Sequence, residues 1–293
     1  MTRPGRPVLP YLAVALAASS WGTWPLLLRR AEAVGPLPAA LEAAIVMASI
    51  TVLSGVFSLF DRAARSATRR ERAWVAWMGV SDAFNVLLFF TAYKITITVA
   101  VLTHYLMPVF VAIVAPLVLK ERLTRRTLLA VGASLLGLLA MLGHSPAAGS
   151  AAALGWSAVL GAGSAAFYAS NVIVNKFVID AFSTSEVMFW HGLIATPLLA
   201  AFVAPQAWRE LSPNAAAFLA LVAIGPGAIA ALAFVWGLRR MPAAHASTLT
   251  LLEPVVAVLL GASALGEAPG WRTIVGAVLV LSGAVAVMTQ ARG

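Results

Sequence analysis

The sequence predicts an all-α membrane protein with ten transmembrane helices, arranged as two inverted five-helix repeats. Hydrophobic residues make up 61% of its 293 residues and charged residues only 11%. The mean hydropathy of +0.92 lies far above that of soluble domains. A helix needs roughly 20 apolar residues to cross the hydrocarbon core of a bilayer. Ten such stretches fill the chain, at 9–28, 38–60, 73–93, 97–119, 127–143, 152–174, 185–205, 214–237, 244–264 and 272–289.

The basic residues indicate how the chain is oriented. The formal net charge is +9, but Lys and Arg occur in short runs between apolar stretches, which argues against a nucleic-acid partner. Loops rich in Lys and Arg stay on the cytoplasmic side of a membrane. With both termini inside, the inside segments hold 15 of the 20 Lys and Arg residues and the outside loops hold 5. We therefore expect a multi-pass protein of a bacterial-type inner membrane with both termini in the cytoplasm.

A sequence repeat relates the two halves of the chain. When residues 100–142 are laid over 246–288 at a constant offset of 146, 11 of the 43 positions carry the same residue. Shared apolar composition does not readily place Pro, Glu and Gly at one common offset. The matches of these three types are Pro108 with Pro254, Glu121 with Glu267 and Gly137 with Gly283.

Each half therefore holds five spans, in residues 1–146 and 147–293. Because five is an odd number, the second copy enters the membrane the opposite way up, which gives an inverted-topology repeat. The charges agree, since the loop 120–126 holds four basic residues and its counterpart 266–272 holds one. We expect equivalent loops of the two halves on opposite sides of the membrane.

The repeated motif resembles a known family. A Pro-containing span followed by a Leu-x-Glu turn occurs as LMPVFVAIVAPLVLKERLT and again as LEPVVAVLLGASALGEAPG. In this the chain resembles the drug/metabolite transporter superfamily, in its ten-helix branch with two EamA-type domains. The resemblance implies efflux of small metabolites such as amino acids, purines or organic cations. The segments HYLMPVF and AFYASNVIVNKF are similar to aromatic amino-acid exporters of the YddG type.

Polar residues within the spans are the candidate site residues. An ionisable group in a span costs roughly 2.5–3.5 kcal/mol on insertion scales, so it usually faces a protein interior or an aqueous cavity. Asp82, Asn85 and Phe89 lie at i, i+3 and i+7, on one helical face. This face is either a wall of the solute cavity or a polar clamp between helices.

Two further groups are expected to contact the solute. Trp21 and Trp24 on the first span either stack on a planar or cationic solute or form part of an interfacial aromatic belt. The sixth span carries the longest polar stripe of the second half, which we expect to line the transport route. The stripe consists of Ser164, Tyr168, Asn171 and Asn175.

His104 and Tyr105 lie just before Pro108, whose missing N–H frees a backbone carbonyl one turn earlier. This pattern predicts a hinge. His104 is either a proton relay near neutral pH or a structural hydrogen-bond donor. Trp190 and His191 have the same two interpretations.

Glu253 precedes Pro254 where the first copy has Met107, so the halves differ by one carboxylate at a matched position. It either serves coupling or a substrate amine, or it is a buried, hydrogen-bonded carboxyl. Glu121, at a span end, is expected to cap or brace a turn. Both prolines are candidate gating hinges, and a bending point is predicted in the eighth span. Its residues are Gly225, Pro226 and Gly227.

These features favour a secondary transporter that exports a small amphiphilic metabolite, an amino acid or an organic cation, by alternating access. A channel or receptor, or an intramembrane lipid-modifying enzyme, is the alternative. The enzyme would need clustered acids with a metal or a nucleophile with its base, but the chain has no Cys and no HExxH motif. We expect no catalysis, cofactor or metal. The expected partners are the solute, the bilayer and a coupled proton, and the oligomeric state is left open.

Overall fold

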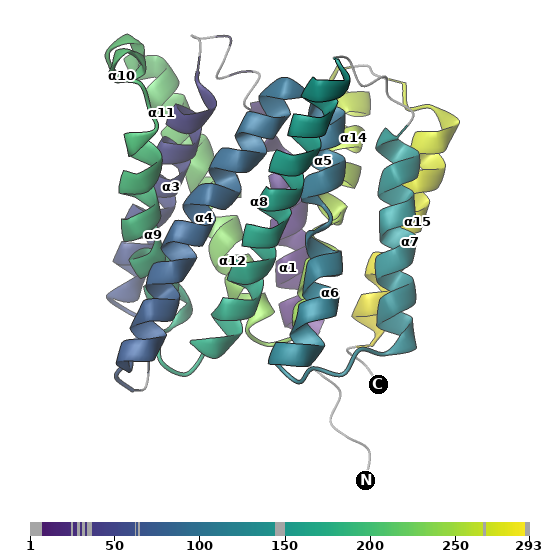
Figure 1. The fold of residues 1–293 in the computed structure, drawn as a ribbon, viewed down its shortest axis with the longest axis horizontal. Coiled ribbons are helices and arrows are strands. Elements are labelled where there is room, and N and C mark those ends of the chain that lie inside the picture. Colours follow the sequence, from purple (N-terminus) through teal and green to yellow (C-terminus); the bar gives the residue numbers. More distant parts are fainter. Residues whose placement is uncertain are drawn as a thin grey trace.

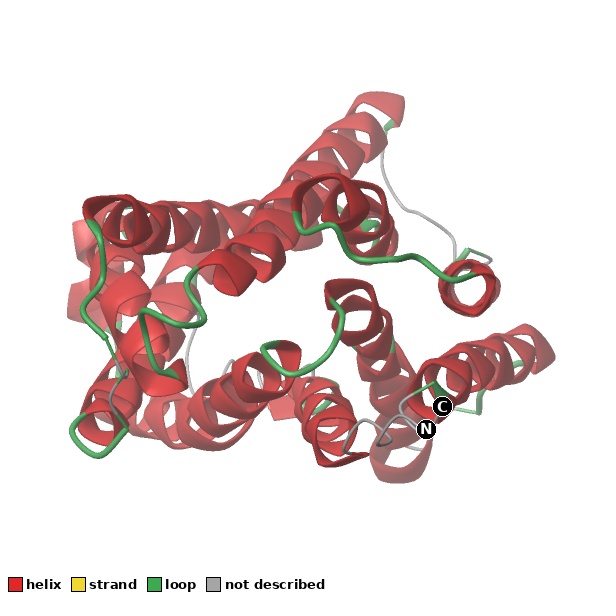
Figure 2. Cartoon of the chain, turned by 90° about the horizontal axis from the view of Figure 1, so that it is seen from below, coloured by secondary structure: helices red, strands yellow, loops and turns green. Residues whose placement is uncertain are grey.

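A computed structural model shows an all-helical chain in the part it describes, which is residues 8–24, 26–27, 30, 33, 37–61, 63, 65–143, 150–265 and 268–290 (Figure 2). The helices of the first half are α1 (Val8–Trp21), α3 (Ala39–Ser58), α4 (Arg69–Ile95), α5 (Ile97–His104), α6 (Met107–Val118) and α7 (Arg125–Leu142). The second half holds α8 (Ala151–Phe177), α9 (Thr184–Ala201), α10 (Pro205–Glu210), α11 (Pro213–Val222), the π-helix η1 (Ala223–Ile229), α12 (Ala230–Leu238), α13 (Ala243–Leu249), α14 (Leu252–Leu265) and α15 (Trp271–Thr289).

Local capping sets where two of the central helices begin. At α4 the Thr68 side chain accepts from the Glu71 backbone N–H, and the Glu71 carboxylate accepts from the Thr68 N–H. Ser183 and Glu186 form the same capping box at α9. Each box satisfies two backbone donors that a helix start leaves unpaired. Glu186 therefore serves to start a helix, although the sequence places it inside a predicted span.

Eight helical segments in the described part are long and apolar enough to cross a membrane. α9 has 18 residues, and α1 is shorter, with 14 residues ending at Trp21. The first predicted span, 9–28, is therefore wrong as one continuous helix in the described residues, because a turn follows at Gly22 and Thr23. The predicted boundary between residues 146 and 147 lies outside the described residues.

Three predicted spans contain breaks. The segment 97–119 is divided between α5 and α6 at Tyr105, and 244–264 is divided between α13 and α14 at Thr250. Each second helix has a proline at its start, where the missing N–H costs no helical hydrogen bond. The third break is the π-helix η1, which contains the predicted bending point. A continuous apolar window hides such breaks, although the prolines mark them.

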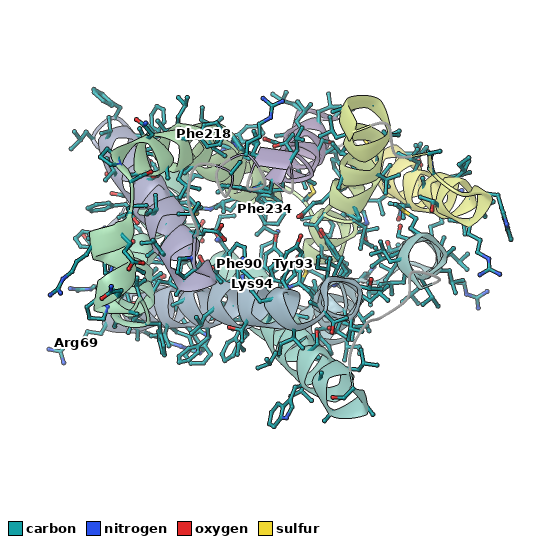
Figure 3. The ribbon with its side chains drawn as sticks, turned by 90° about the horizontal axis from the view of Figure 1, so that it is seen from above. Arg69, Phe90, Tyr93, Lys94, Phe218 and Phe234 are labelled. Atoms are coloured by element: carbon teal, nitrogen blue, oxygen red, sulfur yellow. The ribbon has the colours of Figure 1, made fainter. Side chains whose placement is uncertain are left out.

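The helices form two facing rows (Figures 1 and 3). In one row α8 packs between α4 and the broken pair α5–α6, and in the other α1 packs between α12 and α14. The paired helices α3 and α9 join the rows at one side, through α4 and η1. The paired helices α7 and α15 lie at the other side, where α13 contacts both. α1 begins and α15 ends at the same end of the bundle, which we call the terminal end.

The helix starts follow the sequence repeat. α5 begins at Ile97 and α13 at Ala243, and α7 begins at Arg125 and α15 at Trp271, so both pairs are 146 residues apart. The equivalent helices α7 and α15 also pack on each other. A Cβ added at Gly137 would lie 2.5 Å from the Gly276 carbonyl oxygen, which shows how closely the two backbones approach.

Candidate solute-binding site

A polar network lies at mid-depth in the bundle. Asp82 is the central residue of α4, with 13 residues of the helix on either side. Its Oδ1 accepts a hydrogen bond from Asn171 Nδ2 of α8 at 3.1 Å, and its Oδ2 lies 3.2 Å from His191 Nε2 of α9. One carboxylate therefore joins three helices. The predicted clamp is present, and the Asp82 side chain nevertheless keeps 19% of its surface accessible.

The network continues from Asp82 to the broken helix. Asn85 Nδ2 lies 3.4 Å from Asp82 Oδ1, and the Ser164 hydroxyl lies 2.8 Å from Asn85 Oδ1. His104 Nδ1, at the end of α5, is 2.8 Å from the same hydroxyl. Four helices, α4 and α5 from the first half and α8 and α9 from the second, thus meet in one chain of hydrogen bonds. We call it the polar network, and its members are Asp82, Asn85, His104, Ser164, Asn171 and His191.

The partners of Ser164 fix the tautomer of His104. The Ser164 hydroxyl has one hydrogen and faces two oxygens that can only accept, the Asn85 carbonyl and its Oδ1. His104 Nδ1 must therefore donate to Ser164, which leaves a lone pair on Nε2 of the neutral ring. This Nε2 has no hydrogen-bond partner in the described part of the chain and is not fully buried. It can accept a hydrogen bond from a solute.

Aromatic rings border the network in a continuous series. The His104 ring lies 4.3 Å from Phe89 and is stacked on Tyr168 at 5.7 Å. Tyr168 contacts Phe234 at 6.4 Å, and Phe234 contacts Trp21 at 5.2 Å. We call these five residues the aromatic row, which spans α4, α5, α8, α12 and α1. Of its members, Phe234 could not be predicted, because it is one apolar residue in an apolar helix.

Figure 3 shows where one member of the aromatic row, Phe234, lies. Seen from above, Phe234 of α12 and the α4 residues Phe90 and Tyr93 lie on opposite sides of the central region between the two helix rows. Except for the buried Phe234, the members of the aromatic row are only partly buried. The series therefore offers ring surface inside the bundle.

A second carboxylate stands beside the aromatic row. The Tyr105 hydroxyl lies beside the carboxyl group of Glu253, at the start of α14, and interacts with it electrostatically. Tyr168 interacts electrostatically with both Glu253 and Asp82. Glu253 is partly accessible, so its carboxylate can still meet a cation. The predicted asymmetry at this position brings one more carboxyl group to a site that both halves build.

Two predicted contact residues lie away from this network. Trp190 is 49% exposed and contacts the Phe189 ring. Because successive residues point about 100° apart around a helix, His191 faces the bundle while Trp190 faces outward. Trp190 does not join the polar network in this structure, and its contact with a solute stays a prediction. Trp24 packs near η1, where a Cβ added at Gly227 would lie 3.8 Å from its ring.

The terminal end is held together by a carboxylate at the start of α13. Glu121 Oε2 accepts from the Ala243 backbone N–H at 2.8 Å, which confirms its prediction as a cap. Its Oε1 lies 3.7 Å from Lys176 Nζ, and that ammonium donates to the Met241 carbonyl. Three segments distant in sequence therefore meet at one carboxylate: the α6–α7 linker, the end of α8 and the α12–α13 linker.

His245 makes a second, buried tie at this end. Its Nδ1 lies 2.8 Å from the Tyr11 hydroxyl of α1, and its Nε2 lies 3.1 Å from the Thr127 hydroxyl of α7. Sequence reasoning missed Tyr11 and Thr127, because neither stands out in an apolar window. Nearby, Arg239 donates to the Ile179 and Phe182 carbonyls, and burial lowers its pKa below the ordinary value.

The short helices α5 and α13, which are equivalent in the repeat, differ in how many of their residues are buried. All seven residues of α13 are buried, whereas Ala100 is the only buried residue of α5. α13 lies at the terminal end and α5 toward the opposite end (Figure 1). The bundle is therefore packed more tightly at the terminal end.

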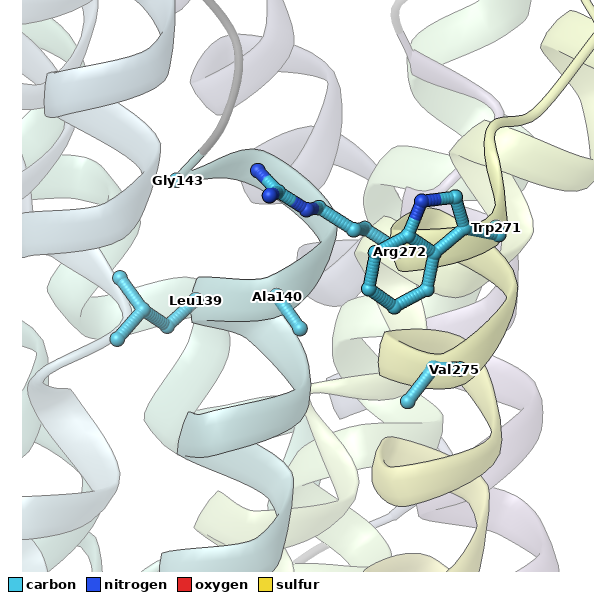
Figure 4. Close-up of a pocket in the computed structure, with 6 residues that line it drawn as sticks. All are labelled: Leu139, Ala140, Gly143, Trp271, Arg272 and Val275. Carbon is cyan, nitrogen blue, oxygen red and sulfur yellow. The ribbon is translucent and has the colours of Figure 1, made fainter.

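A separate pocket of about 330 Å³ lies between α7 and α15 (Figure 4). Apart from Arg272, its lining is backbone, alanine or apolar side chains, and it includes no residue of the polar network. Arg272 itself lies over the Trp271 ring, 5.4 Å from its centroid. We do not place the solute there. Its lining residues are Leu139, Ala140, Gly143, Trp271, Arg272 and Val275.

The long apolar helices and the polar network at mid-depth define a multi-pass membrane protein. The model of the EamA-like transporter family matches twice, over residues 8–143 and 155–289. The chain therefore belongs to the EamA-like transporter family. It is consequently a membrane transporter by family, and the two matches agree with the two copies of the sequence repeat.

A solved structure supports the fold. One crystal structure of a protein with 20% sequence identity superposes with a TM-score of 0.76, covering 95% of this chain and 97% of the other. At that identity the likeness concerns the fold alone. No curated protein matches the chain.

Proposed function

We propose that this protein is a secondary transporter that exports a small amphiphilic solute with an ammonium group, either an amino acid, aromatic ones included, or an organic cation. The observation that carries the proposal is the partly accessible Glu253 carboxylate beside the aromatic row and the open Nε2 of His104. Each of these groups suits one part of such a solute.

The recognition chemistry follows from these groups. A primary ammonium group donates hydrogen bonds and carries a positive charge, which suits the Glu253 carboxylate and the His104 lone pair, whereas a quaternary ammonium group offers its charge alone. The faces of Tyr168 and Trp21 attract cations and cover apolar surface. No Lys or Arg forms a hydrogen bond with the polar network among the described residues, which disfavours a phosphorylated solute.

Alternating access is proposed from the repeat. Ten spans in two copies of opposite orientation, with both termini in the cytoplasm of a bacterial-type cell, would make α5 and α13 equivalent elements at opposite faces. The difference in their burial supports a state closed at the terminal end. The breaks at Pro108, Pro254 and η1 are the proposed hinges. A state in which α5 is buried and α13 is exposed would then be open at the cytoplasmic face.

Counterflow in liposomes tests the proposal. Vesicles loaded with unlabelled L-phenylalanine or phenyltrimethylammonium should accumulate the labelled form of the same compound transiently, because a carrier exchanges one for the other. A channel would equilibrate the label without accumulation, and an enzyme would return a changed molecule. The two probes separate an amino-acid transporter from an organic-cation transporter. Absence of exchange for both, with folded protein in the vesicles, would overturn the proposed function.

A further inference from the structure

The contacts of the two His191 ring nitrogens imply an extra proton. His191 Nδ1 lies 2.9 Å from the Val187 carbonyl of the preceding turn, and a carbonyl can only accept. Nδ1 must therefore carry a hydrogen. The other ring nitrogen, Nε2, faces Asp82 Oδ2 at 3.2 Å. A neutral ring with its hydrogen on Nδ1 has only a lone pair at Nε2, which a carboxylate oxygen would repel.

The contact between Nε2 and Oδ2 consequently requires one more proton. Either the ring is an imidazolium facing a carboxylate, or a neutral ring accepts a hydrogen bond from a protonated Asp82. Both forms have the same composition and no net charge. Loss of the proton to water leaves a pair with a charge of −1 and no hydrogen bond between α4 and α9 at this point. Asp82 Oδ1 still faces the amides of Asn171 and Asn85.

The surroundings of Asp82 and His191 link this pair to the groups that are proposed to bind the solute. The elements packed on α4 and α9 are α3, α5, α8 and α12. Tyr168 of α8 interacts electrostatically with Asp82, and His104 of α5 reaches it through Ser164 and Asn85. Among the described residues, no other ionisable side chain of these elements forms a hydrogen bond or an ion pair with Asp82 or His191. These other side chains are Glu42 of α3, Arg69, Arg70, Glu71, Arg72, Tyr93 and Lys94 of α4, Lys176 of α8, Glu186 of α9 and Arg239 at the end of α12.

We propose that Asp82 and His191 together form a proton-binding site, which releases one proton as the solute cation binds and takes one up as the cation leaves. The cation and the proton would compete because each reduces the negative charge of the two carboxyl groups that interact with Tyr168. These groups are Glu253 and Asp82. The pair is connected to the solute site by the hydrogen bonds of the polar network. The protein would then exchange protons for its solute. This inference rests on the proposed function.

Proton release on binding tests the inference. The purified protein in weakly buffered detergent, with a pH indicator, is saturated with L-phenylalanine or with phenyltrimethylammonium, neither of which titrates appreciably near pH 7. The wild type should release close to one proton per bound solute, and the apparent affinity should rise with pH by up to about tenfold per unit. Asp82→Asn should release none per bound solute. His191→Gln is the second variant, and the exposed Glu210→Gln is the control that keeps the wild-type value.

The outcomes separate the two proposals. Counterflow without proton release, and with an affinity independent of pH, would leave a transporter and overturn the proton-binding site. Undiminished release in both folded variants would also overturn it. If neither probe is exchanged or bound by the wild type, the proposed function fails and the inference fails with it. If one variant does not fold, the other variant and the pH dependence of the wild type decide.

Discussion

Replacing Glu253 by Gln is expected to reduce solute exchange by roughly thirtyfold or more while the protein remains folded. Gln keeps the size of the side chain and an acceptor for the Tyr105 hydroxyl, but it removes the charge that is proposed to meet the ammonium. Loss of one member of a buried charge pair costs about 2 kcal/mol or more, which is roughly thirtyfold in affinity. The position has no carboxylate in the first repeat, where Met107 stands.

Counterflow of both probes measures this effect, with thermal unfolding in detergent to confirm the fold. Glu210→Gln is the matched control, because it makes the same chemical change on an exposed residue of α10. Tyr105→Phe should have a smaller effect, since it removes the hydroxyl beside Glu253 but keeps the carboxyl group. If Glu253→Gln exchanges both probes as the wild type does, the carboxyl is structural and our assignment of the ammonium site is wrong.

Replacing Glu121 by Ala should open the terminal end. The change leaves the Ala243 N–H without its partner and removes the contact with Lys176. An unsatisfied backbone donor and a lost charged contact together cost about 2 kcal/mol, so the population of opened molecules should rise roughly thirtyfold. The affected helix is α13, whose Ser247 is completely buried in this structure.

Thiol labelling measures the opening. The chain has no Cys, so Ser247→Cys provides a single probe for a membrane-impermeant maleimide. The Glu121→Ala background should label much faster from the side of the termini. Glu71→Ala is the control, because Glu71 caps α4 and makes no contact with α13. Equal labelling rates in the two backgrounds would show that the Glu121 contacts do not close this end.

Much of the polar network could be predicted, because polar residues in apolar spans are costly and rarely face lipid. Asp82, Asn85, Asn171 and His191 each stood out for this reason. Their sequence separation, 109 residues between Asp82 and His191, hid the fact that they form one network. Helix packing decides which polar faces meet, and a periodic pattern shows only which residues share a face.

Other features left no readable signal in the sequence. Phe234 lies in an apolar helix where any residue could face lipid, and its neighbours Tyr168 and Trp21 come from other helices. Trp190 lies on the outward side of α9 although its neighbour His191 joins the polar network, and the sequence pattern did not separate the two. Composition cannot separate a lining aromatic ring from a lipid-facing one.

The helix breaks are an intermediate case. Pro108, Pro254 and the segment Gly225–Gly227 were visible as sequence signals, and each lies in or beside a break in the structure. Hydropathy alone would have kept the three spans continuous, because a broken helix stays apolar when protein surrounds the freed backbone groups.

The most direct test of the account concerns the opposite orientation of the two repeats. Ser66 and Ser212 are equivalent at the offset of 146, in the linkers before α4 and α11. Single-cysteine variants Ser66→Cys and Ser212→Cys can be treated with an impermeant maleimide in intact cells and again after permeabilisation. We expect Ser212→Cys to react in intact cells and Ser66→Cys to react only after permeabilisation. Reaction of both from the same side would contradict an inverted repeat and the alternating access built on it.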